Sequence, residues 1–125
     1  MVKTIMVVDD DPSVAYTVKQ GLELDVNYRV ISVNSGIKCF ELLKQGELPD
    51  VILLDIMMPG MSGWETLNII RKNESWRSIP VVFLTARTDN IAKNAGGFLA
   101  DDYIEKPFKL LELKQRIERI LNKKI

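Results

Sequence analysis

The sequence predicts an α/β protein with a doubly wound parallel sheet of five strands and helices on both faces. Two observations support this class. Short, unbroken apolar runs alternate with longer stretches of helical periodicity, and several of these runs end abruptly in polar or turn-forming residues. Strands buried on both faces give such runs, and strict alternation with helices is typical of a parallel sheet. The 125 residues, 46% of them hydrophobic, suit one domain with a packed core.

The first strand and helix are predicted at the N-terminal end of the sequence. The apolar run within Lys3–Asp9 indicates a buried strand that ends in acidic residues. Asp11 and Pro12 are residue types favoured at the N-cap and at the first helical position, so they predict a helix start. Apolar residues at helical spacing continue this helix to about Leu24.

The second strand and helix follow directly. Residues Tyr28–Val33 are rich in β-branched and aromatic side chains, which favours a short strand. Ser35 is suited to cap a helix that ends at Gly46. The residues expected to face inward from this helix are Ile37, Phe40 and Leu43.

The most informative strand is Val51–Asp55, where four apolar residues lead into a carboxylate before Pro59-Gly60 turns the chain. Ser62 can cap the helix that follows. The residues expected on its inner face are Trp64, Leu67 and Ile70. Ile79–Thr85 is predicted as another buried strand, which ends in a hydroxyl group.

The C-terminal part contains the weakest and one of the clearest predictions. Asp89–Ala100 permits a helix, but Gly96-Gly97 would cost it about 2 kcal/mol relative to alanine. Asp102–Glu105 is predicted as a short edge strand, and Lys109 to about Lys124 as a helix. The apolar residues expected to face inward from that last helix are Leu110, Leu113, Ile117 and Ile120.

This order of elements favours the strand order 2-1-3-4-5, the flavodoxin-like arrangement of a three-layer sandwich. The direction of winding reverses between strands 1 and 3, and ligands bind at the carboxyl ends of the strands at that point. Asp9 and Asp10 end the first strand, Asp55 ends the third, and Thr85 and Lys106 end the fourth and fifth. All five residues are therefore expected on one rim of the sheet.

The residue types on this rim point to metal-assisted phosphoryl chemistry. Two unit charges ~4 Å apart repel by about 4 kcal/mol at an effective dielectric of 20, so clustered aspartates raise their pKa values or bind a divalent cation. The hard oxygen donors suit Mg²⁺ and not zinc. The available nucleophile is a carboxylate, so Asp55 can form an aspartyl phosphate. Lys106 and Mg²⁺ would stabilise the phosphoryl oxygens, and Thr85 would donate a hydrogen bond.

The composition excludes several other function classes. Lys+Arg and Asp+Glu each number 17, so no basic excess suggests direct nucleic-acid binding or an anionic membrane. No apolar run approaches the ~20 residues that span a bilayer. The sequence contains no histidine, which excludes histidine-based catalysis. With one cysteine, Cys39, and no signal-peptide pattern, a cytoplasmic location is expected.

Four motifs, in this order and at these separations, resemble the receiver domain of two-component response regulators, of the chemotaxis-receiver type. The motifs are Val7–Pro12, Leu53–Gly63, Leu84–Ala86 and Asp101–Phe108, and the resemblance covers nearly the whole chain. It implies one receiver domain over residues 1–125, without an output domain. It also implies a phosphorylation-activated switch that supports its own Mg²⁺-dependent phosphorylation and dephosphorylation, and is not a conventional turnover enzyme.

The resemblance assigns a role to each acidic residue of the rim. Asp55 would accept a phosphoryl group from a histidine kinase. Asp10 would bind Mg²⁺ directly and Asp9 through water, with Asp55 and the backbone carbonyl of Met57 as further ligands. These assignments come from the family pattern and not from spacing alone.

The resemblance also implies how the signal leaves the site. Thr85 and Lys106 would contact the phosphoryl group, and Tyr103 would be the aromatic switch that moves inward as Thr85 is drawn to the phosphate. The Lys106–Pro107 bond would be cis. The surface formed by the fourth helix, the last strand and the last helix would contact a downstream protein or a histidine-phosphotransfer partner.

Three other functions fit these residues less well. A binding module that keeps the fold without the chemistry would not need the complete acidic set. A turnover enzyme of the aspartate-nucleophile phosphatase type uses a second aspartate as an acid at the position held here by Met57. A flavin-binding domain of similar topology is disfavoured because anions prefer a glycine- and hydroxyl-rich loop, and the first strand ends in acids.

Overall fold

The computed structural model describes residues 2–86 and 100–123. The strands are β1 (Lys3–Val8), β2 (Tyr28–Val33), β3 (Val51–Asp55), β4 (Val81–Thr85) and β5 (Asp102–Glu105). The helices described are α1 (Pro12–Leu22), α2 (Gly36–Lys44), α3 (Gly63–Lys72) and α5 (Leu110–Lys123).

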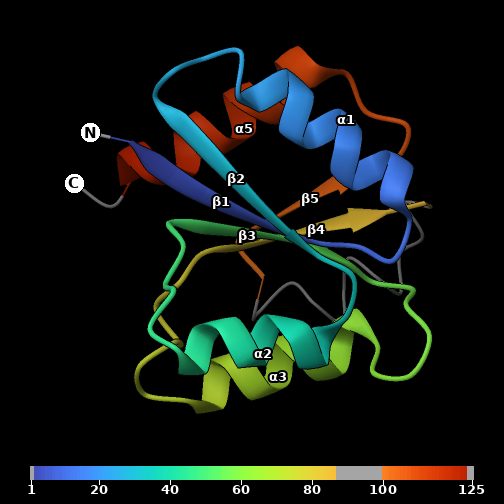
Figure 1. Cartoon of the computed structure of the whole chain (residues 1–125), viewed down its shortest axis with the longest axis vertical. Coiled ribbons are helices and arrows are strands. Elements are labelled where there is room, and N and C mark those ends of the chain that lie inside the picture. Colours follow the sequence, from blue (N-terminus) through green and yellow to red (C-terminus); the bar gives the residue numbers. More distant parts are fainter. Residues whose placement is uncertain (1, 87–99, 124–125) are drawn as a thin grey trace.

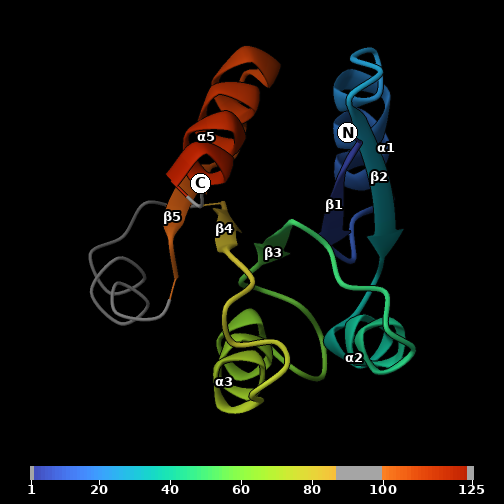
Figure 2. The ribbon, with the colours of Figure 1, turned by 90° about the vertical axis from the view of Figure 1, so that its left-hand side faces the viewer.

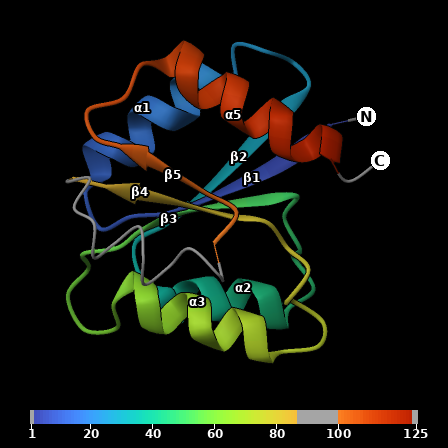
Figure 3. The same cartoon turned by 180° about the vertical axis from the view of Figure 1, so that it is seen from behind.

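The sheet lies between two layers of helices. Its five strands are parallel and follow the order β2-β1-β3-β4-β5 within the described residues. Helices α1 and α5 cover one face, and α2 and α3 cover the other (Figures 1 and 3). Figure 2 shows the strands side by side, with β2 and β5 at the two edges. The predicted fold class and strand order are confirmed.

The predicted helix starts are also confirmed. The carboxylate of Asp11 accepts a hydrogen bond from the Ser13 amide at 2.9 Å, and Pro12 is the first helical residue of α1. Ser35 caps α2. Ser62 and Glu65 form a capping box at the start of α3, in which each side chain accepts from the other's backbone amide. These bonds satisfy amides that have no partner inside the helix.

The core forms two apolar clusters, one on each face of the sheet. Along β3, Ile52 and Leu54 face the layer of α2 and α3, whereas Val51 and Leu53 face the layer of α1 and α5. Both sets are fully buried. The alternation follows from the two-residue period of a strand, and it explains why the sequence of β3 is continuously apolar.

Two side chains on the α2 and α3 side of the sheet, Ile37 and Trp76, differ in burial. Ile37 was expected to face inward, but its side chain is 58% exposed, so this prediction is wrong. The buried face of α2 includes Cys39, Phe40 and Leu43, and Ile37 lies off that face. Trp76, which follows α3 in a loop, is buried against this layer, and its ring stacks on Phe40 with centroids 5.9 Å apart.

One predicted strand begins later than expected. The apolar run starts at Ile79, but β4 starts at Val81 because Pro80 has no amide hydrogen to donate to the ladder. The Pro80 carbonyl still accepts a hydrogen bond from the Ile52 amide at 2.9 Å.

Three further observations concern the predicted fourth helix, the Lys106–Pro107 bond and membrane-spanning helices. The helix predicted over Asp89–Ala100 falls, apart from Ala100, outside the described residues. The Lys106–Pro107 peptide bond is cis, as the family resemblance implied. Among residues 2–86 and 100–123, no helix combines the length and apolar character needed to cross a bilayer.

Candidate functional site

The candidate site lies where the carboxyl ends of four strands meet. Asp9 directly follows β1, and its amide donates to the Val33 carbonyl at 3.1 Å. Asp55 and Thr85 are the last residues of β3 and β4. Lys106 directly follows β5, and its amide donates to the Thr85 carbonyl at 2.6 Å. Parallel strands therefore bring these residues to one rim, as the topology requires.

The structure brings three carboxylates of this rim together. Asp9, Asp10 and Asp55 each offer an oxygen, and these oxygens all lie within 4.8 Å of one another. Asp9 is 2% exposed and Asp55 is 6% exposed, whereas Asp10 is open to solvent. A buried carboxylate is costly unless it is paired or hydrogen-bonded, so this group needs positive charge nearby.

Lys106 supplies positive charge to the two buried carboxylates. Its Nζ lies 2.7 Å from Asp9 Oδ2 and 3.5 Å from Asp55 Oδ1. The other oxygen of Asp9 accepts a hydrogen bond from the Asp11 amide at 2.9 Å. The sequence predicts Lys106 on the rim, but it does not predict that Lys106 lies closer to Asp9 than to Asp55.

Burial and the neighbouring charges shift the pKa values of Asp55 and Lys106. Burial, and then the charge of Asp9, raise the pKa of Asp55 to about 6, although Lys106 and the Met57 amide act in the opposite direction. For Lys106, burial acts to lower the pKa, but the hydrogen bond to Asp9 and the charge of Asp55 outweigh it, so that its pKa is raised. Additional positive charge at the cluster would relieve the repulsion between Asp9 and Asp55.

The donor set fits a hard divalent cation. Asp9, Asp10 and Asp55 supply carboxylate oxygens, and Cys39 is buried inside an apolar cluster rather than at the rim. Met57 follows β3, and its backbone amide acts to lower the pKa of Asp55, which places that amide beside the cluster. Mg²⁺ prefers such oxygen donors and commonly uses one or two carboxylates. The residues that can hold a metal ion are therefore the three aspartates.

Thr85 and Tyr103 occupy neighbouring strands. The Thr85 side chain is buried at the end of β4. Tyr103 lies on β5 and is partly buried, with its ring centroid 6.0 Å from that of Phe83. Phe83 in turn meets Trp64 edge to face at 4.9 Å. The three rings thus form a continuous row from α3 across β4 to β5.

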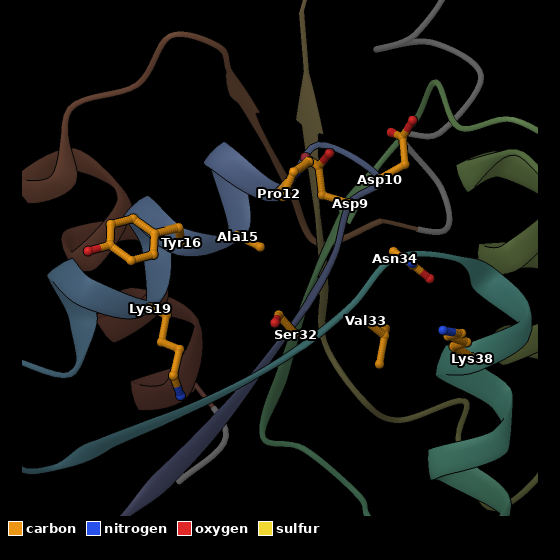
Figure 4. A pocket seen from close by; sticks show the side chains of 10 residues that line it. All are labelled: Asp9, Asp10, Pro12, Ala15, Tyr16, Lys19, Ser32, Val33, Asn34 and Lys38. Atoms are coloured by element: carbon orange, nitrogen blue, oxygen red, sulfur yellow. The ribbon is translucent and has the colours of Figure 1, made fainter.

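A groove of about 520 Å³ adjoins the acidic cluster (Figure 4). It lies between α1 and the start of α2, beside the end of β2. Its lining residues are Asp9, Asp10, Pro12, Ala15, Tyr16, Lys19, Ser32, Val33, Asn34 and Lys38. The sequence predicts only the two aspartates as site residues, because most of the other lining residues come from separate segments outside the family motifs.

These features define an α/β domain with an acidic site at the switch point of its sheet. The chain matches the family model described as "Response regulator receiver domain" over residues 5–118. It therefore belongs to the receiver domains of two-component response regulators, a family of signalling domains and not of conventional enzymes.

Relatives of known sequence and known structure agree with this family. The transcriptional regulatory protein CrdR of Helicobacter pylori is 39% identical over 98% of the chain, and YvrH of Bacillus subtilis is 36% identical over 96%. The solved receiver domain of the Francisella response regulator 1452 is 29% identical, with a TM-score of 0.88 and coverage of 98% of this chain and 99% of that one. The matched region spans 56% of the length of CrdR and 49% of the length of YvrH.

Proposed function

We propose that this receiver domain is a phosphorylation-activated switch in which Asp55 accepts a phosphoryl group from a histidine kinase. The supporting observation is the surroundings of Asp55. Its carboxylate is 6% exposed, lies in a cluster of three aspartates whose oxygens are within 4.8 Å, and is 3.5 Å from the Lys106 ammonium. The nucleophile Asp55, the aspartates that can bind a metal ion and the ammonium group of Lys106 therefore share one small site.

The chemistry follows from these positions. An oxygen of Asp55 attacks phosphorus in the phosphohistidine of the kinase, and a P–O bond forms as the P–N bond breaks. The electron pair of the P–N bond returns to the imidazole of the kinase. Bound Mg²⁺ would supply charge neutralisation for the phosphoryl oxygens. Asp9, Asp10, Asp55 and the Met57 carbonyl would hold that ion.

Lys106 and Thr85 act on the transferred group. Lys106 already reaches both buried carboxylates at 2.7 and 3.5 Å, so a small movement carries its ammonium to a phosphoryl oxygen. The Thr85 hydroxyl donates a hydrogen bond to another oxygen. The domain thus supports its own phosphorylation and the later attack of water that removes the group.

The conformational signal passes from the rim to a binding surface. In the family pattern this surface is formed by the fourth helix, β5 and α5. Thr85 is drawn toward the phosphoryl group, and Tyr103 turns inward against Phe83, which it already contacts. The altered surface binds a downstream protein or a histidine-phosphotransfer partner. CrdR and YvrH are named as transcriptional regulatory proteins, and this chain covers about half of each, so DNA binding is not proposed for these residues.

The test is an intact-mass measurement after incubation with a small acyl phosphate and Mg²⁺. The wild-type chain gains the mass of one phosphoryl group, and Asp55→Asn gains none. Asp11→Asn is the matched control, because asparagine also caps helices well and Asp11 lies beside the site. This control is labelled like the wild type. Labelling of Asp55→Asn at the wild-type level contradicts the proposal, and absence of both labelling and Mg²⁺ binding in the wild type favours a binding module.

A further inference from the structure

Gly63, the first residue of α3, lies against the backbone of the strand that carries Asp55. Its amide donates to the Ile56 carbonyl at 2.8 Å. A Cβ atom on residue 63 would lie 2.3 Å from the carbonyl oxygen of Asp55 and 2.7 Å from the Cα of Ile56. Real Cβ atoms essentially never approach a neighbour more closely than 3.0 Å. No other residue fits here unless this backbone moves.

Space, and not backbone conformation, requires a glycine at this position. The glycines with positive φ in the described part of the chain are Gly46 and Gly60, and Gly63 adopts an ordinary helical conformation. Helix propensity alone would favour alanine over glycine by about 1 kcal/mol. If alanine at position 63 weakens Mg²⁺ binding or slows phosphorylation, the cause is therefore the close approach of this residue to β3.

The same contact closes the loop that follows Asp55. The Gly63 amide and the Ile56 carbonyl join the two ends of this loop, and the capping box of Ser62 and Glu65 fixes the start of α3. Met57 lies inside the loop, and its backbone amide is close enough to the Asp55 carboxylate to act on the pKa of that group. The position of α3 thus controls the backbone of Asp55 and the segment that carries Met57.

We infer that Gly63 is a positioning residue for phosphoryl transfer at Asp55. The absence of a side chain lets the first turn of α3 rest on the Asp55–Ile56 backbone, and this holds the Asp55 carboxylate and the Met57 backbone against Asp9 and Asp10. This role rests on the proposed function. The neighbouring atoms are backbone and cannot rotate away, so a methyl group would displace the end of β3 by about 1 Å, a misplacement that can cost ~100-fold in rate.

The experiment compares Gly63→Ala with Gly21→Ala. Gly21 is also a helical glycine, and a Cβ on it would meet the Leu110 side chain at 2.4 Å, between α1 and α5 and outside the site. Three quantities are measured well below the melting temperature: the Mg²⁺ dissociation constant by calorimetry, the rate of labelling by an acyl phosphate, and the melting temperature itself. Gly63→Ala should weaken Mg²⁺ binding several-fold and slow labelling about 10- to 100-fold. Gly21→Ala should leave both within twofold of the wild type.

The inference is overturned if folded Gly63→Ala binds Mg²⁺ and is labelled within twofold of the wild type. Absence of labelling in the wild type would instead overturn the proposed function. If Gly63→Ala does not fold, the wild-type protein gives the answer by NMR during a Mg²⁺ titration. The Gly63 amide signal should then shift with the same saturation curve as metal binding, while the Gly21 signal stays in place. An unmoved Gly63 signal overturns the inference.

Discussion

Lys106 shows how one residue balances the charges of the site. Its ammonium contacts the carboxylates of Asp9 and Asp55, which are both buried. A cation bound at the aspartates would compete with Lys106 for Asp9 and free it for another anion. The same side chain can therefore stabilise the metal-free protein and contact a phosphoryl group.

Replacement of Lys106 by methionine should lower stability in the absence of metal and increase the stabilisation by Mg²⁺. The change leaves two buried carboxylates without their cation, which should cost about 1–3 kcal/mol in the free energy of unfolding. A bound cation then restores the missing charge, and ligand binding stabilises the folded state. Thermal melts in EDTA and in Mg²⁺ measure both effects. Lys38→Met, an exposed lysine near the same groove, is the control, and equal melting temperatures of Lys106→Met and the wild type in EDTA would contradict the account.

For single residues, the sequence predicts where in the fold a residue lies better than it predicts which groups its side chain contacts. Asp9, Asp55 and Thr85 could be placed on one rim because each ends an apolar run, and the strand order then brings those ends together. The pairing of Lys106 with Asp9 could not be predicted, because it depends on the path of the chain after β5. The tight contact of Gly63 depends on the distance between a helix and a strand, which no local pattern encodes.

At the scale of elements, capping residues fix where the helices begin. Asp11, Ser35 and Ser62 were recognisable in the sequence, since a short polar side chain before an apolar period has a local physical role. Element ends were less predictable. The first helix ends at Leu22 instead of about Leu24. The outward position of Ile37 depends on which face of α2 meets the sheet, which is a tertiary property.

Ser62→Ala should destabilise the protein by about 1 kcal/mol, because the capping box at the start of α3 loses the bond to the Glu65 amide. Urea denaturation measures the change in the free energy of unfolding. Ser32→Ala on the exposed edge of β2 removes a similar hydroxyl without a cap, and should change this free energy by less than half as much. Equal effects of the two substitutions would show that the capping box contributes no special stability.

At the scale of the whole molecule, one sheet joins two apolar clusters. Every strand has a neighbour in the sheet, and central strands such as β3 contribute residues to both clusters. Loss of packing on one face therefore exposes the strands that support the other. The five-strand order also explains the place of the site, because the reversal between β1 and β3 opens the rim where the aspartates meet.

This shared sheet predicts cooperative unfolding. Trp64 and Trp76 both pack in the cluster under α2 and α3, so tryptophan fluorescence reports that face, whereas far-UV circular dichroism reports the helices on both faces. The two probes should give the same urea midpoint within error, as expected for a two-state domain of this size. Two separated midpoints would show that the faces unfold independently.

The most direct test of the central claim is a crystal structure of the chain with Mg²⁺ and beryllofluoride, a phosphoryl analogue. The account predicts one Mg²⁺ ion held at Asp9, Asp10 and Asp55, the analogue attached to the Asp55 carboxylate, and the Lys106 ammonium turned toward its fluorine atoms. A metal ion elsewhere, or an analogue absent from Asp55 while the ion is present, would contradict it.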